Sequence, residues 1–344
     1  MRGAAARRNR CDSGCRQLGG EIPVDGVTDL GGEVFEIDTL MGGHTGITAG
    51  YLIRGDRPCL VETGTALSAP TVVDALTHLG IGPADLATVV VTHIHLDHAG
   101  GVGDIAAAFP NAQIVVHERG ARHLVDPTKL VASAHRVFGP VMDELFGDLK
   151  PTEAERIIAL GEVGSIDLGG GRRLDAFHAP GHASHHLGLL DSITGDLYTG
   201  DAAGVYVPES DELRPATPPP DFDLHLALAS MDRMRDVAPA RLLFSHYGPV
   251  VEVDSALDRS EAVLREWVDM VRQARTMQMD LDHAVAMVRE RTPLAIPDDA
   301  EYDERRDAWE QLSSTAANVA GISRWLDQTE GHGSTSGDAA SVAR

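Results

Sequence analysis

The chain has 344 residues, a formal net charge of -23, 43% hydrophobic residues and 4% aromatic residues. Such an acidic chain repels polyanions, so nucleic acid and anionic membrane surfaces are excluded as expected partners. The 36 glycines suit an α/β protein with many tight turns, and no apolar stretch approaches the ~20 residues needed to span a bilayer.

The two ends of the chain differ from its middle. Residues 1–20 are polar and basic, and residues 329–344 are rich in Gly, Ser and Ala, so both are expected to be disordered tails. The first segment has no apolar core and is not a secretory signal. Cys11, Cys15 and Cys59 form no disulfide framework, which favours a reducing cytoplasm as the location. The alternative for Cys11 and Cys15 is a small metal or redox site.

Between the tails, short apolar runs predict alternating strands and helices. A helix is expected over 70–79, because apolar residues recur there at helical spacing and Gly80 provides a stop. Residues 86–92 form an apolar run, β-branched from Thr88 onward, that is typical of a strand covered on both faces. A helix over 102–109 follows, with further strands at 113–117, 173–178, 186–191, 196–199 and 241–245. Strands that alternate with helices predict helices on the outside of sheets.

The chain changes character after about Asp254. Helices are expected over 255–277, 280–291 and 302–327, and an apolar stripe on the first, which includes Leu264 and Trp267, is expected to pack on the main body. We therefore predict one domain over 21–254 and a helical extension over 255–328 that packs on its core.

Four metal-capable side chains occur within six residues, directly after the strand predicted over 86–92. They are His93, His95, Asp97 and His98. Residues two apart in an extended segment point the same way, so His93 and His95 can converge on one ion. If the chain then turns into a helix, Asp97 and His98 can face a second ion. Imidazole and carboxylate ligands suit divalent first-row metals, and His is a favoured ligand of zinc.

Three later residues occupy the same kind of position. His182, Asp201 and His246 each follow a predicted strand. Sites are commonly built from loops at one edge of a sheet scaffold, so these side chains are candidates to complete the metal site. A lone histidine at a strand end is more often structural, and it is the combination that indicates a site.

This pattern resembles the metallo-β-lactamase superfamily. The match consists of His-x-His-x-Asp-His at 93–98, Gly-His at 181–182, Gly-Asp at 200–201 and a last His at 246, within roughly 22–250. The resemblance implies a four-layer αββα sandwich, with the C-terminal helices as an extension. It also implies that His93, His95 and His182 hold one metal, that Asp97, His98 and His246 hold a second, and that Asp201 bridges both. Asp201 stands where true β-lactamases commonly have Cys, so the chain looks closer to the glyoxalase-II and lactonase branches.

One position departs from the family pattern. Where the family usually has an Asp-x-Gly turn, this chain has Glu62-Thr63-Gly64. The family carboxylate orients a metal ligand, and Glu62 could do so with one more methylene of reach. The alternative is that Glu62 is an ordinary surface carboxylate.

The resemblance implies a hydrolase with two divalent ions. Zinc is the expected metal, with iron or manganese as alternatives, and a hydroxide shared by the two ions would attack a thioester, lactone or related carboxylic ester. Asp97 and Asp201 would orient the hydroxide, and the hydroxyl of Tyr206 could polarise the substrate oxygen. Packing or a loop hydrogen bond is the alternative role for Tyr206. His185 and His186 are expected to support the site rather than to bind metal.

Two other functions stay open at this point. The same ligands can hold iron, so an iron-dependent oxidoreductase such as a persulfide dioxygenase is one rival. A metabolite-binding module with vestigial activity is the other. In every case the partner expected is a small molecule, and a homodimer is the default oligomeric state.

Overall fold

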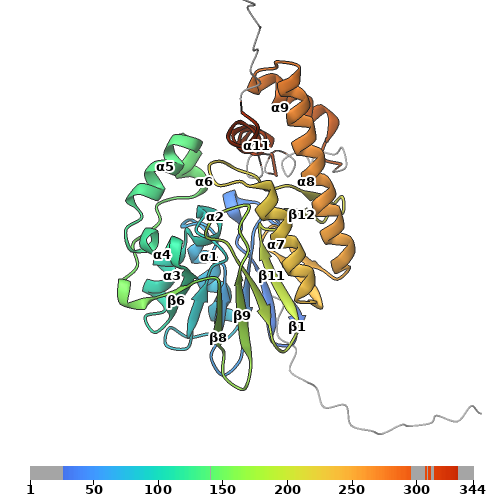
Figure 1. The fold of residues 1–344 in the computed structure, drawn as a ribbon. Helices are drawn as coiled ribbons and strands as arrows, with labels where there is room; N and C mark the ends of the chain where they lie inside the picture. Colours follow the sequence, from blue (N-terminus) through green and yellow to red (C-terminus); the bar gives the residue numbers. More distant parts are fainter. Residues whose placement is uncertain (1–25, 140, 296–306, 308, 311–313, 332–344) are drawn as a thin grey trace, which may run out of the picture.

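The computed structural model describes residues 26–139, 141–295, 307, 309–310 and 314–331 (Figure 1). The tail expected over 1–20, with Cys11 and Cys15, lies outside the described residues. So does the part of the C-terminal tail from residue 332 onward. Within the described residues, no helix is both long and apolar enough to cross a membrane.

The first sheet has seven strands that follow one another in chain order. β1 to β4 are antiparallel, and β4 to β7 are parallel. The strands are β1 (Val27–Gly31), β2 (Val34–Asp38), β3 (Ala49–Ile53), β4 (Cys59–Val61), β5 (Thr88–Val90), β6 (Gln113–His117) and β7 (Ile157–Leu160).

The second sheet has six strands in the order β15-β14-β11-β10-β9-β8, antiparallel except for the β11–β14 pair. They are β8 (Val163–Asp167), β9 (Arg173–His178), β10 (Leu187–Asp191), β11 (Asp196–Gly200), β14 (Arg241–Phe244) and β15 (Gly248–Val250). A separate hairpin pairs β12 (Val205–Val207) with β13 (Glu212–Arg214).

Helices cover the outer face of each sheet, which gives four layers (Figure 1). The first sheet carries α1 (Ala69–His78) and α3 (Val102–Ala108), whose Val72, Leu76 and Ile105 share a buried cluster with strand residues such as Val89. The same side carries α2 (Leu96–Ala99), α4 (Glu118–Val125), α5 (Thr128–Phe138) and α6 (Val141–Leu145), and short 3-10 turns lie at Met41–Gly43 and Ala154–Arg156. The two inner faces share another cluster, which contains Tyr51, Val90 and Tyr198. This arrangement confirms the αββα sandwich expected from the resemblance.

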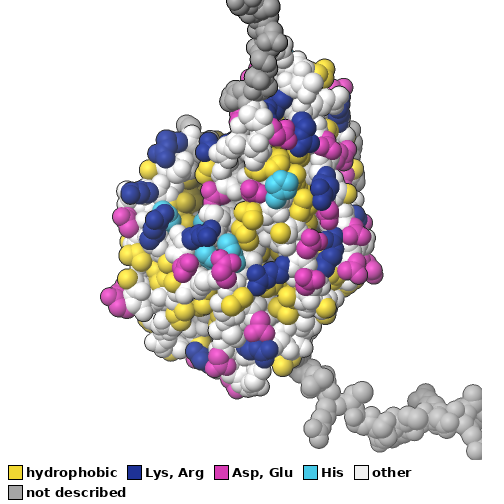
Figure 2. Space-filling view, in the orientation of Figure 1, with side chains coloured by type: hydrophobic (Ala, Val, Ile, Leu, Met, Phe, Trp, Pro, Cys, Tyr) yellow, Lys and Arg dark blue, Asp and Glu magenta, His cyan; other side chains and the backbone are white. Residues whose placement is uncertain are grey.

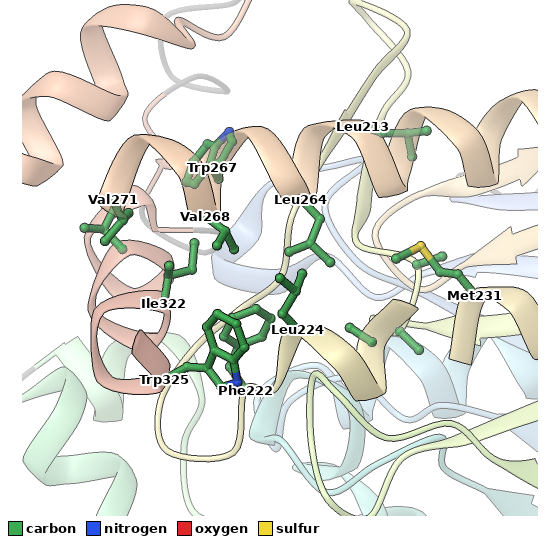
Figure 3. Close-up of a cluster of buried hydrophobic side chains, with 14 of the residues drawn as sticks. Leu213, Phe222, Leu224, Met231, Leu264, Trp267, Val268, Val271, Ile322 and Trp325 are labelled. Atoms are coloured by element: carbon green, nitrogen blue, oxygen red, sulfur yellow. The ribbon is translucent and has the colours of Figure 1, made fainter. Parts of the chain in front are cut away.

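The second sheet carries α7 (Leu224–Asp236) and the C-terminal helices α8 (Val253–Thr276), α9 (Leu281–Arg291) and α11 (Thr315–Glu330). Trp267, Leu264 and Val268 of α8 meet Trp325 of α11 and Phe222 in one buried cluster (Figure 3). The apolar stripe of α8 therefore faces the body of the molecule, because burying these side chains is the main favourable contribution to folding.

Side-chain caps fix where several helices begin. Asp223 accepts a hydrogen bond from Leu226 N at the start of α7, Asp280 accepts one from His283 N, and Ser314 accepts one from Ala317 N. The helix expected over 302–327 is interrupted at Ser314 and ends later than expected, and its expected start at 302 lies outside the described residues. Ser314 is non-helical and starts α11 at residue 315, and α11 extends to Glu330, so residues 329–330 belong to it rather than to a tail.

Candidate metal centre

The segment with four metal-capable residues differs in part from the conformation expected from its spacing. The chain bends at Thr92 and His93 after β5, so the extended stretch expected through His93 is not formed. His95 is extended (φ -62°, ψ 152°) at the residue before α2. Asp97 and His98 then lie within this short helix, as expected.

The turn after β4 holds this segment in place. Thr63 N and Thr63 Oγ1 both donate to His98 O at 2.8 Å, and Gly101 N donates to Gly64 O at 3.0 Å. A Cβ atom at Gly101 would lie 2.9 Å from Thr63 O, closer than real Cβ contacts. Glycine is therefore required where the two backbones meet.

Three histidine nitrogens converge at one point. His93 Nε2 lies 3.0 Å from His95 Nδ1, and His182 Nε2 lies 2.9 Å from His95 Nδ1 and 3.2 Å from His93 Nε2. Three ring nitrogens cannot all form hydrogen bonds with one another, since each carries one proton or one lone pair. Nitrogens bound to a tetrahedral zinc ion at ~2.0–2.1 Å are about 3.3 Å apart. The triangle therefore fits a metal ion.

A second group of ligand atoms lies beside the first. His246 Nε2 is 3.3 Å from His98 Nε2 and 3.3 Å from Asp97 Oδ2. The distance from His98 Nε2 to Asp97 Oδ2 is 3.6 Å. These three residues can hold an ion together, as the family resemblance implied.

Asp201 faces both groups. Its Oδ1 lies 3.3 Å from His98 Nε2, and its Oδ2 lies 3.6 Å from His182 Nε2. A carboxylate with one oxygen toward each group can bridge two ions. The donor set of five imidazoles and two carboxylates is the chemistry that zinc, iron and manganese accept in proteins.

Backbone carbonyls fix the orientation of two ligands. His182 Nδ1 donates to Ala216 O at 2.9 Å, and His246 Nδ1 donates to Ile47 O at 3.0 Å. With the proton on Nδ1, the lone pair of Nε2 points at the metal position. Neither Ala216 nor Ile47 could be predicted from the sequence, because any residue supplies the same carbonyl.

Glu62 lies beneath the second group and is buried, with 1% of its surface exposed. Its Oε1 accepts a hydrogen bond from Thr92 N at 3.1 Å, and its Oε2 lies 3.7 Å from His98 Nδ1. The structure thus excludes an ordinary surface carboxylate at this position. It places the carboxylate where it can orient His98.

The two groups of candidate ligands differ in their protonation states. Burial, reinforced by His182, lowers the pKa of His95 to about 3, and burial together with His98 lowers the pKa of His93. Burial opposes protonation of His98 too, but the carboxylates of Asp201 and Asp97 outweigh it and raise its pKa well above the usual range. The first group is therefore neutral and offers lone pairs, while the carboxylates draw positive charge to the second.

The two histidines after His182 have supporting positions. His186 Nε2 accepts a hydrogen bond from Asp201 N at 3.1 Å, and the rings of His186 and His93 stack with centroids 4.8 Å apart. His185 Nδ1 accepts one from Ile94 N at 3.4 Å. Both contacts are to backbone amides next to ligands, which matches the expected role.

Tyr206 does not have the position expected of a catalytic hydroxyl. It stands on β12 between Val205, which lines the cavity at the metal centre, and Val207. Successive strand residues point to opposite faces, so Tyr206 faces away from that cavity. Its ring packs near Phe244 and its hydroxyl bonds to Asp211. The structure therefore favours the packing role over polarisation of the substrate.

A cavity of about 210 Å³ opens onto the metal centre. His95, Asp97, His182, Asp201 and His246 lie at its base, and its walls come from α5, Phe146, the prolines at 218–220 and the start of α11. Figure 2 shows hydrophobic and histidine side chains gathered over the middle of the face seen in Figure 1. The segment over 132–150 contributes Ser133, Ala134 and Phe146 to this cavity.

A second cluster, which the sequence did not indicate, consists of His117, Glu162 and His178. His117 Nδ1 accepts a hydrogen bond from Arg119 N at 3.2 Å, so its proton is on Nε2. The rings of His117 and His178 also stack, with centroids 4.5 Å apart. Neither feature suits shared metal ligation, so we assign no ion to this cluster.

Comparison with known proteins gives one consistent result. The family model described as the metallo-beta-lactamase superfamily matches residues 42–246, more than half of the chain. The chain is 27% identical to the metallo-beta-lactamase fold-containing protein ST1585 of Sulfurisphaera tokodaii over 197 residues, 56% of this chain and 69% of that protein. It is 29% identical to the N-acyl homoserine lactonase AttM of Rhizobium radiobacter over 191 residues, 54% of this chain and 61% of that protein. A beta-lactamase domain protein from Burkholderia ambifaria shares the fold with a TM-score of 0.63 and 18% identity, over 92% of this chain and 91% of that one.

Proposed function

Because the chain belongs to the metallo-β-lactamase superfamily, we propose that it is a hydrolase that binds two divalent metal ions and cleaves a thioester, lactone or related carboxylic ester. The observation that carries the proposal is the position of Asp201, with one carboxylate oxygen toward His98 and the other toward His182. A ligand shared in this way is typical of two-metal hydrolytic sites.

Two divalent ions, when bound, supply a water nucleophile at neutral pH and polarise the substrate oxygen. His93, His95 and His182 would hold one ion, and Asp97, His98 and His246 the other. The protein then needs no nucleophilic serine or cysteine. In the described part of the chain the one cysteine, Cys59, is fully buried.

The two carboxylates have different tasks. The side chain of Asp97 is 17% exposed and that of Asp201 is 7% exposed, although both border the cavity. We assign proton transfer to the Asp97 carboxylate, since it is the more accessible of the two. Asp201, held by the His186 contact to its backbone, orients the nucleophile.

The similarity to the lactonase AttM supports lactones within this class of substrates. The walls of the cavity support an ester with an apolar group, because leucine, phenylalanine and proline side chains contribute to them. Zinc is the proposed metal, since imidazole and carboxylate ligands around an open position are typical of catalytic zinc.

The test combines metal analysis with hydrolysis. The protein is expressed without added metal and its metal is quantified by mass spectrometry. The metal is then stripped and restored while the hydrolysis of a p-nitrophenyl ester, a thioester and a lactone is followed. We expect zinc and metal-dependent hydrolysis of at least one substrate, and a loss of at least about 100-fold in kcat/KM for Asp201→Ala.

Asp232→Ala is the matched control, because Asp232 is exposed on α7 and pairs with Arg235. It should keep the wild-type rate. A coloured protein with stoichiometric iron and no hydrolysis of any substrate would favour the oxidoreductase instead. Tight binding of a metabolite without turnover would favour the binding module.

A further inference from the structure

The cavity above the metal centre has a polar group on the wall contributed by the C-terminal helix. Asn318 of α11 lines the cavity and is 4% exposed. It lies in the first turns of α11, which begins after the cap residue Ser314 at the same cavity. This side chain is not a metal ligand and has no part in the hydrolysis derived above.

The orientation of the Asn318 amide is fixed by its neighbour. Thr217 N donates to Asn318 Oδ1 at 2.5 Å, and an N–H donor requires the oxygen at that position. The amide nitrogen Nδ2 therefore points away from Thr217. No described residue accepts a hydrogen bond from Nδ2, and Asn318 lines the cavity, so a ligand in the cavity can accept one.

A donor at the cavity wall that has no partner among the described residues acts as a selective element. Water can satisfy Nδ2 in the free protein. A ligand that displaces this water must offer an acceptor, or Nδ2 loses a hydrogen bond at a cost of ~1–3 kcal/mol. Sites of this kind reject analogues that lack the matching polar group.

The charge of the lining indicates which acceptors fit. Apart from the candidate metal ligands, the described residues that line the cavity include no lysine, arginine, aspartate or glutamate. The walls are otherwise mostly apolar, with Leu130, Phe146 and the prolines at 218–220. An uncharged acceptor, such as an amide carbonyl, suits this lining better than a carboxylate or a phosphate.

We propose that Asn318 is a specificity-determining residue, whose Nδ2 donates a hydrogen bond to an uncharged carbonyl oxygen in the non-reacting part of the ester substrate. This inference rests on the proposed hydrolase function and deepens it. The substrate is thus an uncharged ester or lactone with a second acceptor oxygen in an otherwise apolar group.

The test compares acyl chains of equal length on one leaving group. The probes are p-nitrophenyl hexanoate, its isosteres p-nitrophenyl 3-acetamidopropanoate and 4-formamidobutanoate, and the p-nitrophenyl monoester of adipate. The measured quantity is the ratio of kcat/KM for each polar ester to that for the hexanoate. For the zinc-loaded wild type we expect at least one amide ester to exceed the hexanoate by about 5- to 10-fold.

Two variants of the same residue separate recognition from structure. Asn318→Asp keeps an oxygen for Thr217 N but removes the donor, and we expect the amide preference to fall to a ratio near one. Asn318→Leu removes both the acceptor for Thr217 N and the donor. Its Tm and metal content show how much Asn318 contributes to folding and to the metal centre. Asn111→Asp, at an exposed asparagine outside the cavity, is the matched control and should keep the wild-type ratio.

Three outcomes would overturn the inference. The first is a wild type that shows no preference for either amide ester over the hexanoate. The second is an Asn318→Asp variant that is folded and metal-loaded and retains the preference. The third is a preference for the adipate monoester, which would assign an anionic substrate. If the wild type hydrolyses the thioester or the lactone but none of these esters, the inference alone is overturned. If it hydrolyses none of these esters and neither the thioester nor the lactone, the proposed function is contradicted, and the inference with it.

Discussion

Glu62 is the residue where this chain departs most clearly from the family pattern, and its environment explains how the longer side chain is accommodated. The backbone is in the left-handed region (φ 63°), which is costly for a residue other than glycine. Hydrogen bonds compensate, because the carboxylate accepts from Thr92 N at 3.1 Å and from Ser245 Oγ at 3.5 Å. The second oxygen is then left facing His98.

Replacing Glu62 by glutamine should weaken metal binding. Glu62→Gln presents an amide to His98 Nδ1, which removes the acceptor that orients this ligand. We expect a 10- to 100-fold loss of affinity, the range found for groups that support metal ligands. Competition with a chromophoric chelator measures it. Glu33→Gln, at an exposed residue that pairs with Arg54, is the control. An unchanged affinity in Glu62→Gln would contradict the assigned role.

At the residue scale, the seven candidate ligands could be named from the sequence. Local spacing points to the four at 93–98, whereas the other three depended on their strand-end positions and on the family resemblance. Tyr206 could not be placed in the same way. Its alternation with Val205 and Val207 indicates two faces, but only the packing of the hairpin decides which face meets the metal centre. Asn318 gave no signal either, since its role depends on Thr217, about 100 residues earlier in the chain.

At the scale of elements, the ends of β5, β9, β11 and β14 explain the convergence of the ligands. His93, His182, Asp201 and His246 each follow one of these strands within a few residues. Strand positions were predictable because apolar runs are bounded by turn residues. The start of α11 was not, because the predicted helix ran through Ser314, and the side chain of Ser314 caps a new helix instead.

Gly321 lies where α11 packs against the backbone of Thr217 and Pro218. A Cβ atom there would overlap Thr217 O. Replacing glycine by alanine within a helix normally stabilises by about 1 kcal/mol. Gly321→Ala should instead destabilise the protein by about 1–3 kcal/mol, because backbone atoms on both sides leave no room.

Thermal denaturation measures this change, with a Tm lower by several degrees. Arg324→Gly, at an exposed position of the same helix, is the control, because it measures the effect of helix propensity on the Tm. Its metal affinity should be unchanged. A Gly321→Ala variant with a raised Tm would show that the contact is not tight in solution.

At the scale of the whole molecule, the four layers followed from the resemblance rather than from the pattern of apolar residues. Seven strands in one sheet and six in the other, with their order, depend on pairings between distant segments that periodicity does not reveal. That strands are covered on both faces could be predicted from the sequence, because buried strands read as continuous apolar runs.

Metal removal should lower the stability of the whole domain. The ligands come from both sheets, so ions that bind only the folded state stabilise it by RT ln(1 + [M]/Kd), about 4 kcal/mol at 1,000-fold excess over Kd. We expect a chelator to lower the Tm and added zinc to restore it. Asp201→Ala should show a smaller response to both. If the chelator leaves the Tm unchanged in a protein shown to have lost its metal, the site does not contribute to stability.

The contact between α11 and the segment at 216–217 has a thermodynamic consequence. His182 Nδ1 donates to Ala216 O, and the next residue, Thr217, is bonded to Asn318. The docking of α11 on the segment at 216–217 and the binding of metal at His182 are therefore linked equilibria. By reciprocity, the factor by which a seated helix tightens metal binding equals the factor by which the metal holds the helix in place. For a protease that cuts α11 only when the helix is detached, the rate of cleavage should therefore fall as metal binds at His182.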